Sequence, residues 1–178
     1  STFSIKKRNG SDRQISAPQK ELKAIQRKLA HVLTCVYEPK ICAYGFIEGK
    51  SIVGNASQHS KRALVLNIDL KDFFSQIHFG RVRGMLMKPP YFIGEEAATT
   101  IAQIACLNGK LPQGAPSSPI ITNMICAPLD NALMRLAKKT NCIYTRYADD
   151  ITISTYKKAF DKDVVYYEDD EIRIGSKL

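Results

Sequence analysis

The chain has 178 residues, 44% of them hydrophobic, and a formal net charge of +9 at pH 7. This length suits one large or two small domains with a buried core, and no apolar run reaches the roughly 18 residues of a membrane span. The five cysteines form no CxxC pair, which disfavours a zinc site or a disulfide framework and fits a reducing cytoplasm. The strongly basic charge favours a polyanionic partner, most often nucleic acid.

The first 60 residues predict a hairpin, a helix and an irregular segment. Alternation at Phe3 and Ile5 and the turn signal Asn9-Gly10 predict a hairpin over residues 3–16. Ser16 and Gln19 have the spacing of a capping box, so a helix should follow. Its apolar face is predicted from Leu22, Ile25, Leu29, Val32 and Val36, with lysines and arginines on the other face. Residues 39–60 are glycine-rich and predict an irregular segment.

The remaining elements alternate between strands and helices. Residues 64–69 predict a strand buried on both faces, because nearly every position is apolar. A helix is predicted over residues 95–107, stopped by Asn108-Gly109. Another helix is predicted over residues 118–138, with a kink at Pro128. Residues 143–154 predict two short strands around a polar tip.

Three carboxylates have unusual surroundings. Asp69 ends an apolar strand, and Asp149 and Asp150 form the tip of the predicted hairpin. Acids rarely adjoin buried strands unless they are paired or bind metal. If the strands are neighbours, the carboxylates converge and repel one another, and hard divalent cations would relieve that repulsion. The alternative is that Asp149-Asp150 is simply a polar turn, where Asp is common.

Three motifs together resemble those of reverse transcriptases. Tyr147–Asp150 resembles the YxDD signature, and Asn67–Phe74 resembles the first catalytic motif of the family. Between them, Leu111–Pro119 is similar to the nucleotide-pocket motif LPQGxxxSP. The motifs occur in the order of the family, and the resemblance spans nearly the whole chain. It implies an RNA-directed DNA polymerase that uses two Mg²⁺ ions, with Mn²⁺ as an alternative.

The resemblance also implies roles for individual residues. Asp69, Asp149 and Asp150 would be the catalytic carboxylates and would bind metal together with the backbone carbonyl of Leu70. Phe74 would be a steric gate that excludes a 2′-hydroxyl and so favours dNTPs. Gln113 and Gly114 would border the incoming nucleotide.

Two basic residues of the N-terminal hairpin are candidates to hold the triphosphate. Arg13 suits this role because a guanidinium binds phosphate oxygens bidentately. Lys7 is the second candidate, and a solvated surface lysine is an equally good interpretation of it.

A further motif is similar to one found in bacterial retron enzymes. Residues 55–59, Asn-Ala-Ser-Gln-His, resemble the NAxxH motif before the first catalytic strand, which makes Asn55 and His59 candidates for RNA binding. His59 also fits a turn histidine with satisfied hydrogen bonds. The retron group implies an RNA template and primer, nascent DNA, a dedicated structured RNA, an effector protein and a role in anti-phage defence. Alternatives are a group II intron-like or other bacterial reverse transcriptase, a template-independent polymerase, or a non-catalytic RNA-binding relic.

The implied fold is α+β, with the fingers and palm of a right-hand polymerase and an antiparallel palm sheet packed by helices. We expect residues 1–62 to form the fingers and residues 63–178 the palm, with residues 80–118 returning to the fingers. Because the later palm motifs and the thumb motifs of the family do not occur before residue 178, we expect the thumb to be absent from this chain. A bacterial cytoplasmic location is expected, without membrane contact.

Overall fold

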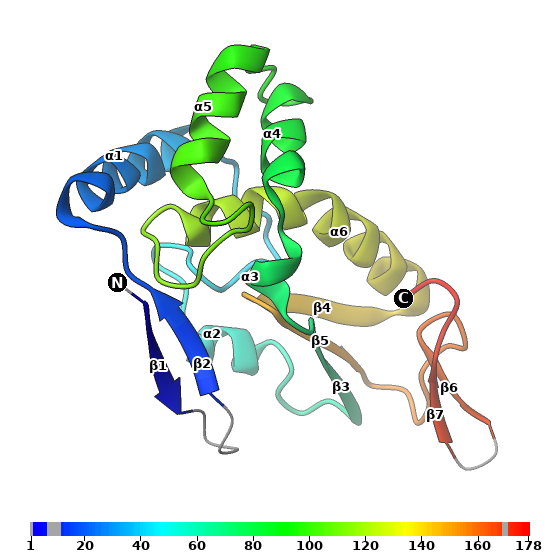
Figure 1. Ribbon diagram of the computed structural model, residues 1–178. Coiled ribbons are helices and arrows are strands. Elements are labelled where there is room, and N and C mark those ends of the chain that lie inside the picture. Colours follow the sequence, from blue (N-terminus) through cyan, green and yellow to red (C-terminus); the bar gives the residue numbers. More distant parts are fainter. Residues whose placement is uncertain (1, 7–11, 169–170) are drawn as a thin grey trace. The chain divides into compact units, whose positions relative to one another are not determined.

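The computed structural model describes residues 2–6, 12–168 and 171–178, and only the backbone of residues 13 and 14. Two compact units divide the chain. Unit 1 comprises Ser1–Glu38 and Asp72–Ile125, and unit 2 comprises Pro39–Lys71 and Cys126–Leu178. The predicted boundary between fingers and palm at residues 62 and 63 stays a prediction. Figure 1 labels the helices and strands of both units.

Unit 1 begins with the predicted hairpin. Strands β1 (Thr2–Lys6) and β2 (Asp12–Ser16) pair antiparallel, with Thr2 opposite Ser16. Helix α1 (Lys20–Val36) follows. The predicted capping box is wrong, because Ser16 still belongs to β2 and the N-cap is Gln19, which makes no side-chain capping hydrogen bond.

Helix α1 does not bury its apolar face as predicted. Leu22, Ile25, Val32 and Val36 are 39–57% exposed, whereas the buried side chains are Gln26 and Leu33. Gln26 donates from Nε2 to the carbonyl of Ile104 at 2.7 Å and so ties α1 to α5 (Glu95–Ala105). Within unit 1, the helix is therefore held partly by a buried polar contact that periodicity could not reveal.

The middle of unit 1 contains two helices that the sequence analysis did not predict. They are α3 (Phe73–Gln76) and α4 (Phe79–Met87). The predicted helix over residues 95–107 is confirmed as α5. Helices α4 and α5 pack together, and Arg83 on α4 forms an ion pair with Glu95 and donates to Thr99 Oγ1 at 2.9 Å.

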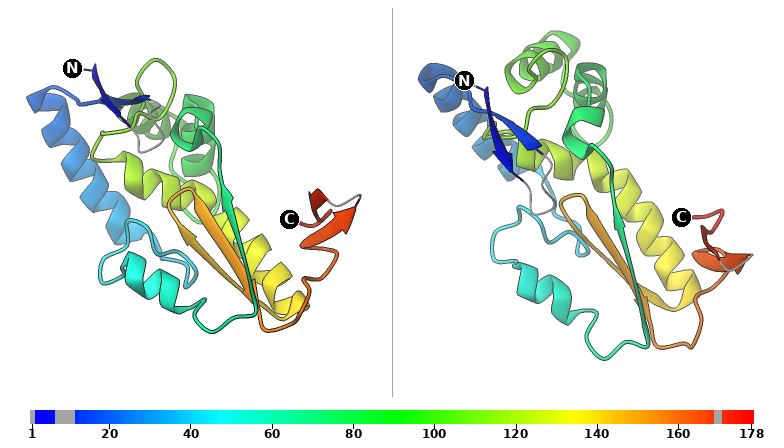
Figure 2. Two further views of the ribbon diagram at one scale, coloured as in Figure 1. Left: turned by 90° about the horizontal axis from the view of Figure 1, so that it is seen from below. Right: turned by 60° about the horizontal axis from the view of Figure 1, so that its bottom comes forward.

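Unit 2 is built on a three-stranded antiparallel sheet of order β3-β5-β4. Its strands are β3 (Leu64–Asp69), β5 (Asp150–Thr155) and β4 (Cys142–Tyr147). Helix α6 (Ser118–Thr140) begins in unit 1 and continues through Pro128 into unit 2, where it runs along the sheet (Figure 2). Leu133, Leu136 and Ala137 of α6 form a hydrophobic cluster with sheet residues that include Tyr144, Ile151 and Ile153.

Strand β3 is an edge strand, so the expectation of burial on both faces is wrong. Leu64, Leu66 and Ile68 are half-buried, whereas Val65, Asn67 and Asp69 are exposed. The segment expected to be irregular contains α2 (Ile52–Ser57). A further hairpin pairs β6 (Val165–Glu168) with β7 (Glu171–Ile174).

The described residues thus combine helices with antiparallel sheets, as an α+β fold requires. Among these residues, the longest helices are too polar or too short to form a membrane span.

Candidate active site

The β3-β5-β4 sheet has one apolar face and one polar face. Directly opposite residues of antiparallel strands share a face, and successive residues alternate between faces. The apolar face carries Leu66, Ile68, Tyr144, Ile151 and Ile153. The polar face carries Asn67, Asp69, Thr145, Asp150 and Thr152. Two of the three predicted catalytic acids therefore lie on the same face of one sheet.

The structure brings the predicted carboxylate segments together within unit 2. Asp69 is the register partner of Asp150, and Asp149 lies in the two-residue turn between β4 and β5. The backbone N–H of Leu70 donates to the carbonyl of Asp149 at 3.1 Å. Among the described residues, however, no three His, Cys, Asp or Glu side chains stand at metal-binding spacing. The backbones of these segments lie side by side, but the described side chains form no group of three potential metal ligands, so the metal-binding role of the three acids stays a prediction.

The electrostatics of Asp150 fit a site for a cation. Partial burial raises the pKa of this carboxyl group, and the negative charges of Asp149 and Asp69 raise it further. Like charges held this closely disfavour ionisation, and a bound cation reverses the effect. Carboxylate and carbonyl oxygens are also the ligands that hard divalent cations prefer. The donor set thus fits the divalent ions that reverse transcriptases generally use.

The turn that carries Asp149 has a strained backbone. Ala148 has a φ of 57°, in the left-handed region that favours glycine. Such a conformation costs of the order of 1–3 kcal/mol and persists only where the surrounding structure enforces it. A guanidinium nitrogen of Arg146, Nη1, donates to the carbonyl of Ala148 at 2.8 Å.

Arg146 belongs to a fully buried ion pair that the sequence analysis did not anticipate. Its side chain and that of Asp130 on α6 are both 0% exposed, with Arg146 Nη2 2.8 Å from Asp130 Oδ2. The Tyr144 hydroxyl also donates to Asp130 Oδ1, at 2.7 Å. A charged residue within an apolar strand and another within an apolar helix were the available signal, because buried charges need partners.

The charge of Asp130 affects its titratable neighbours. Burial, and then the negative charge of Asp130, raises the pKa of the Cys42 thiol to about 12. The same two causes raise the pKa of Tyr144. For Arg146, burial lowers the pKa, but hydrogen bonding and the charge of Asp130 outweigh it, so the net shift is upward. The guanidinium therefore stays charged inside the protein.

Two of the predicted nucleotide-binding residues share a cavity of unit 1. Phe74 and Gln113 line a cavity of about 450 Å³, together with Asp12, Asp72 and Lys110 among others. Gly114 has a φ of 107°, and a Cβ there would lie 2.8 Å from Ile15 Cγ2. Ser16 N donates to Gln113 O at 2.8 Å. The glycine-containing loop thus lies directly against the end of β2, which only glycine permits.

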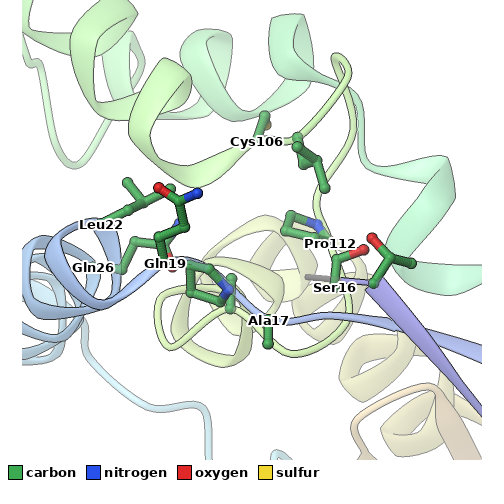
Figure 3. A pocket seen from close by; sticks show the side chains of 11 residues that line it. Ser16, Ala17, Gln19, Leu22, Gln26, Cys106 and Pro112 are labelled. Carbon is green, nitrogen blue, oxygen red and sulfur yellow. The ribbon is translucent and has the colours of Figure 1, made fainter.

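Neither of the two candidate phosphate-binding residues has a side chain that the structure describes. Lys7 lies outside the described residues, and Arg13 is placed in β2 by its backbone alone. Another cavity of unit 1, of about 280 Å³, contains none of the predicted site residues (Figure 3). It is lined by residues from the end of the hairpin, α1 and the loop after α5.

The NAxxH residues point into unit 2. His59 is 8% exposed, and its ring nitrogens lie 2.7 Å from Ser154 Oγ and 2.7 Å from Thr145 Oγ1. Asn55 in α2 is 9% exposed. His59 thereby bridges β4 and β5 on the face of the sheet that carries Asp69 and Asp150. An RNA-binding role for Asn55 and His59 stays a prediction.

Comparison with known proteins identifies the family. The model of the family described as "Reverse transcriptase (RNA-dependent DNA polymerase)" matches residues 5–160, so the chain belongs to the reverse transcriptase family. Within this family, it is similar to retron enzymes.

Similarity to individual retron enzymes confirms the resemblance that the motifs indicated. The chain is 37% and 38% identical to the retron Mx65 and Mx162 reverse transcriptases of Myxococcus xanthus, over 86% and 88% of its length. It is 37% identical to the retron Ec86 reverse transcriptase of Escherichia coli over 80% of its length. The chain spans 40%, 36% and 44% of these three relatives.

Proposed function

We propose that this protein is an RNA-directed DNA polymerase of the retron type. The observation that carries the proposal is the register of the β3-β5 pair, which sets Asp69 opposite Asp150 and next to the turn with Asp149. Family membership and the similarity to three retron enzymes support the same activity. Their names suggest that the protein acts in a retron and copies RNA into DNA.

The proposed reaction is attack of a primer hydroxyl on the α-phosphate of a dNTP, with release of pyrophosphate. Asp69, Asp149 and Asp150 would hold two Mg²⁺ ions, with Mn²⁺ as a substitute and the Leu70 carbonyl as a further ligand. Bound divalent ions lower the pKa of an attacking hydroxyl and neutralise charge on the leaving phosphates. The exposed polar face beside these acids, with Asn67 and Thr152, offers hydrogen-bonding groups to a primer end.

The cavity of unit 1 is the proposed nucleotide pocket. The ring of Phe74 would exclude a ribose 2′-hydroxyl, and the Gln113 amide would hydrogen-bond the substrate. Gly114 would allow its backbone to approach the substrate, and Arg13 and Lys7 would bind the triphosphate. The shared cavity of Phe74 and Gln113 supports this assignment.

The proposed partners follow from the retron type. They are a structured RNA that serves as template and primer, the nascent DNA, dNTPs and an effector protein for anti-phage defence in the bacterial cytoplasm. We assign residues 1–62 to the fingers and residues 63–178 to the palm, with residues 80–118 returning to the fingers.

The test is primer extension on a supplied RNA by the full natural protein that carries this chain. Asp149→Asn should lower dNTP incorporation by about a thousandfold or more, because several kcal/mol of transition-state stabilisation are lost. Asp163→Asn removes a surface carboxylate of the same unit and should leave incorporation unchanged. Extension by Asp149→Asn at the wild-type rate would exclude the catalytic role of Asp149, whereas a wild-type protein that incorporates no dNTP would favour a non-catalytic RNA-binding protein.

A further inference from the structure

The turn that carries Asp149 is held by several buried contacts, whose importance for catalysis rests on the proposed polymerase activity. The turn between β4 and β5 consists of Ala148 and Asp149. Ala148 has the positive φ that tight hairpin turns use at this position, normally supplied by glycine. An alanine there needs surrounding contacts that enforce the conformation.

The first such contact comes from the buried guanidinium of Arg146. Its Nη1 donates to the Ala148 carbonyl at 2.8 Å, while Nε and Nη2 donate to the two oxygens of Asp130, both at 2.8 Å. This bidentate pairing fixes the plane of the guanidinium, so Nη1 is aimed in one direction. Nη1 is thereby directed at the Ala148 carbonyl in the turn.

Arg146 acts from behind the sheet. It occupies a register position opposite Ile151, on the apolar face, whereas Asp69 and Asp150 lie on the other face. Its side chain is fully buried, so it has no access to a substrate. Its direct contact with the active-site segment is therefore the hydrogen bond to the backbone of the turn.

The second contact comes from the backbone of residues 42–45. Arg146 N donates to Cys42 O, and Tyr44 N donates to Arg146 O, both at 2.8 Å. The segment thus runs parallel to β4, with Ala43 bridged to Arg146. At Gly45 the chains are so close that a Cβ would lie 2.3 Å from the nitrogen of Ala148.

A lysine secures this segment. The ammonium group of Lys50 donates to the carbonyls of Ile41 and Ala43, both at 2.7 Å, and lies 4.5 Å from the centre of the Tyr44 ring. Two elements thus contact the turn. Arg146 of β4 donates a hydrogen bond to the Ala148 carbonyl, and the segment with Gly45 lies close against the Ala148 nitrogen.

The buried ion pair of Asp130 and Arg146 suits the positioning of the Ala148 carbonyl better than it suits stability. A buried ion pair can often be replaced by well-packed apolar side chains without loss of stability, so stability alone does not require it. Apolar side chains, however, cannot hold a carbonyl group. We propose that Asp130, Arg146 and Gly45 are positioning residues that fix the Ala148-Asp149 turn in the shape needed for catalysis.

The decisive variant is Asp130→Leu/Arg146→Met, tested in the full natural protein. It removes both charges together and keeps a comparable volume, so folding should survive. We expect a folded protein whose melting temperature falls modestly, because the Tyr144 hydroxyl and the Ala148 carbonyl lose these partners. Its kcat for dNTP incorporation should be lowered by about tenfold to a hundredfold, as small misplacements of catalytic groups cause. Because nucleotide binding uses other residues, KM for dNTP should change much less.

A second readout does not depend on activity. Mn²⁺ binding to the protein without nucleic acid, followed by electron paramagnetic resonance, should weaken by about tenfold in this variant if the turn loses its shape. Tyr144→Phe is the matched control, since it removes a hydrogen bond to Asp130 while leaving Arg146 on the Ala148 carbonyl. The control should retain wild-type kcat and Mn²⁺ affinity.

Gly45→Ala tests the second contact without altering any charge. It should also lower kcat and Mn²⁺ affinity, because the new Cβ displaces the turn. Gly84→Ala is its control, since a Cβ at Gly84 meets nothing within 4 Å. A folded Gly45→Ala protein with wild-type kcat and Mn²⁺ affinity would remove Gly45 from the proposal.

The outcomes separate this inference from the proposed function. A wild-type protein that incorporates no dNTP on RNA would overturn the polymerase assignment itself. An active wild type together with a folded double variant of unchanged kcat and Mn²⁺ affinity would overturn the positioning role of the ion pair. If the double variant does not fold, Arg146→Lys decides the same question, because lysine keeps the charge but lacks the forked donors.

Discussion

The two faces of the β3-β5-β4 sheet each contain a buried polar network, and the two networks differ in charge and in what they hold. On the apolar face, Arg146 and Asp130 form an ion pair that reaches the turn. On the polar face, His59 joins two strand hydroxyls, those of Thr145 and Ser154. In the first network, the Arg146 guanidinium holds the turn through a hydrogen bond to a backbone carbonyl. In the second, hydrogen bonds between His59 and two hydroxyl groups attach the NAxxH segment to the strands.

One sheet can thus meet two separate structural requirements with two kinds of network. A neutral network is enough to attach a segment, because each hydroxyl can donate or accept a hydrogen bond. Holding one carbonyl in a fixed direction favours the rigid planar guanidinium. The two networks should therefore respond differently to substitution and to pH.

Asp130→Asn should have the largest effect on stability. It leaves the buried guanidinium of Arg146 without its countercharge, and breaking a buried pair in this way costs about 3–5 kcal/mol. Urea unfolding followed by circular dichroism measures the loss. A cost below about 1 kcal/mol would show that the pair does not behave as a buried one.

His59→Leu should have an intermediate effect. It leaves the buried hydroxyls of Thr145 and Ser154 without their imidazole partner, which costs about 1–3 kcal/mol. The same unfolding experiment applies. If the loss equals that of Asp130→Asn, the proposed distinction between the charged and the neutral network fails.

The pH dependence of stability should identify His59. Burial, and then the positive charge of Arg62, lowers its pKa from the ordinary value of 6.5. The unfolded chain therefore binds a proton at a higher pH than the folded protein, so stability falls as the pH drops from 6.5 through the folded pKa. Melting curves across this range should show the fall in the wild type, and His59→Gln should remove that part of it.

Lys139→Met should have the smallest effect. Lys139 and Asp163 form an ion pair at 2.7 Å, but the lysine side chain is 68% exposed. Exposed pairs contribute little, because water and salt screen them. We expect an unchanged melting temperature, and a clear drop would mean that exposure does not distinguish the ion pairs of this protein.

Much of the local structure could be predicted from the sequence. Residues 64–69 form β3 as expected, and Asp69 lies opposite Asp150 in the register of β3 and β5, whereas their catalytic role stays a prediction. The short helices α3 and α4 were missed, because periodicity is a weak signal in short or irregular segments. The predicted apolar face of α1 was assigned to a core, yet the buried residues of the helix are Gln26 and Leu33, and the partner of Gln26 lies 78 residues away.

The motifs were enough to indicate the family, and the periodic patterns predicted the order of the main strands and helices, because both are local properties of the sequence. The motifs also nominated Asp69, Asp149 and Asp150 as catalytic acids, a role that stays a prediction. Only the tertiary structure decided that Asp130 pairs with Arg146, that His59 points inward, and that Gly45 touches the turn. These contacts join separate elements of unit 2, and a buried charge or histidine reveals in the sequence that it needs a partner but not which one it finds.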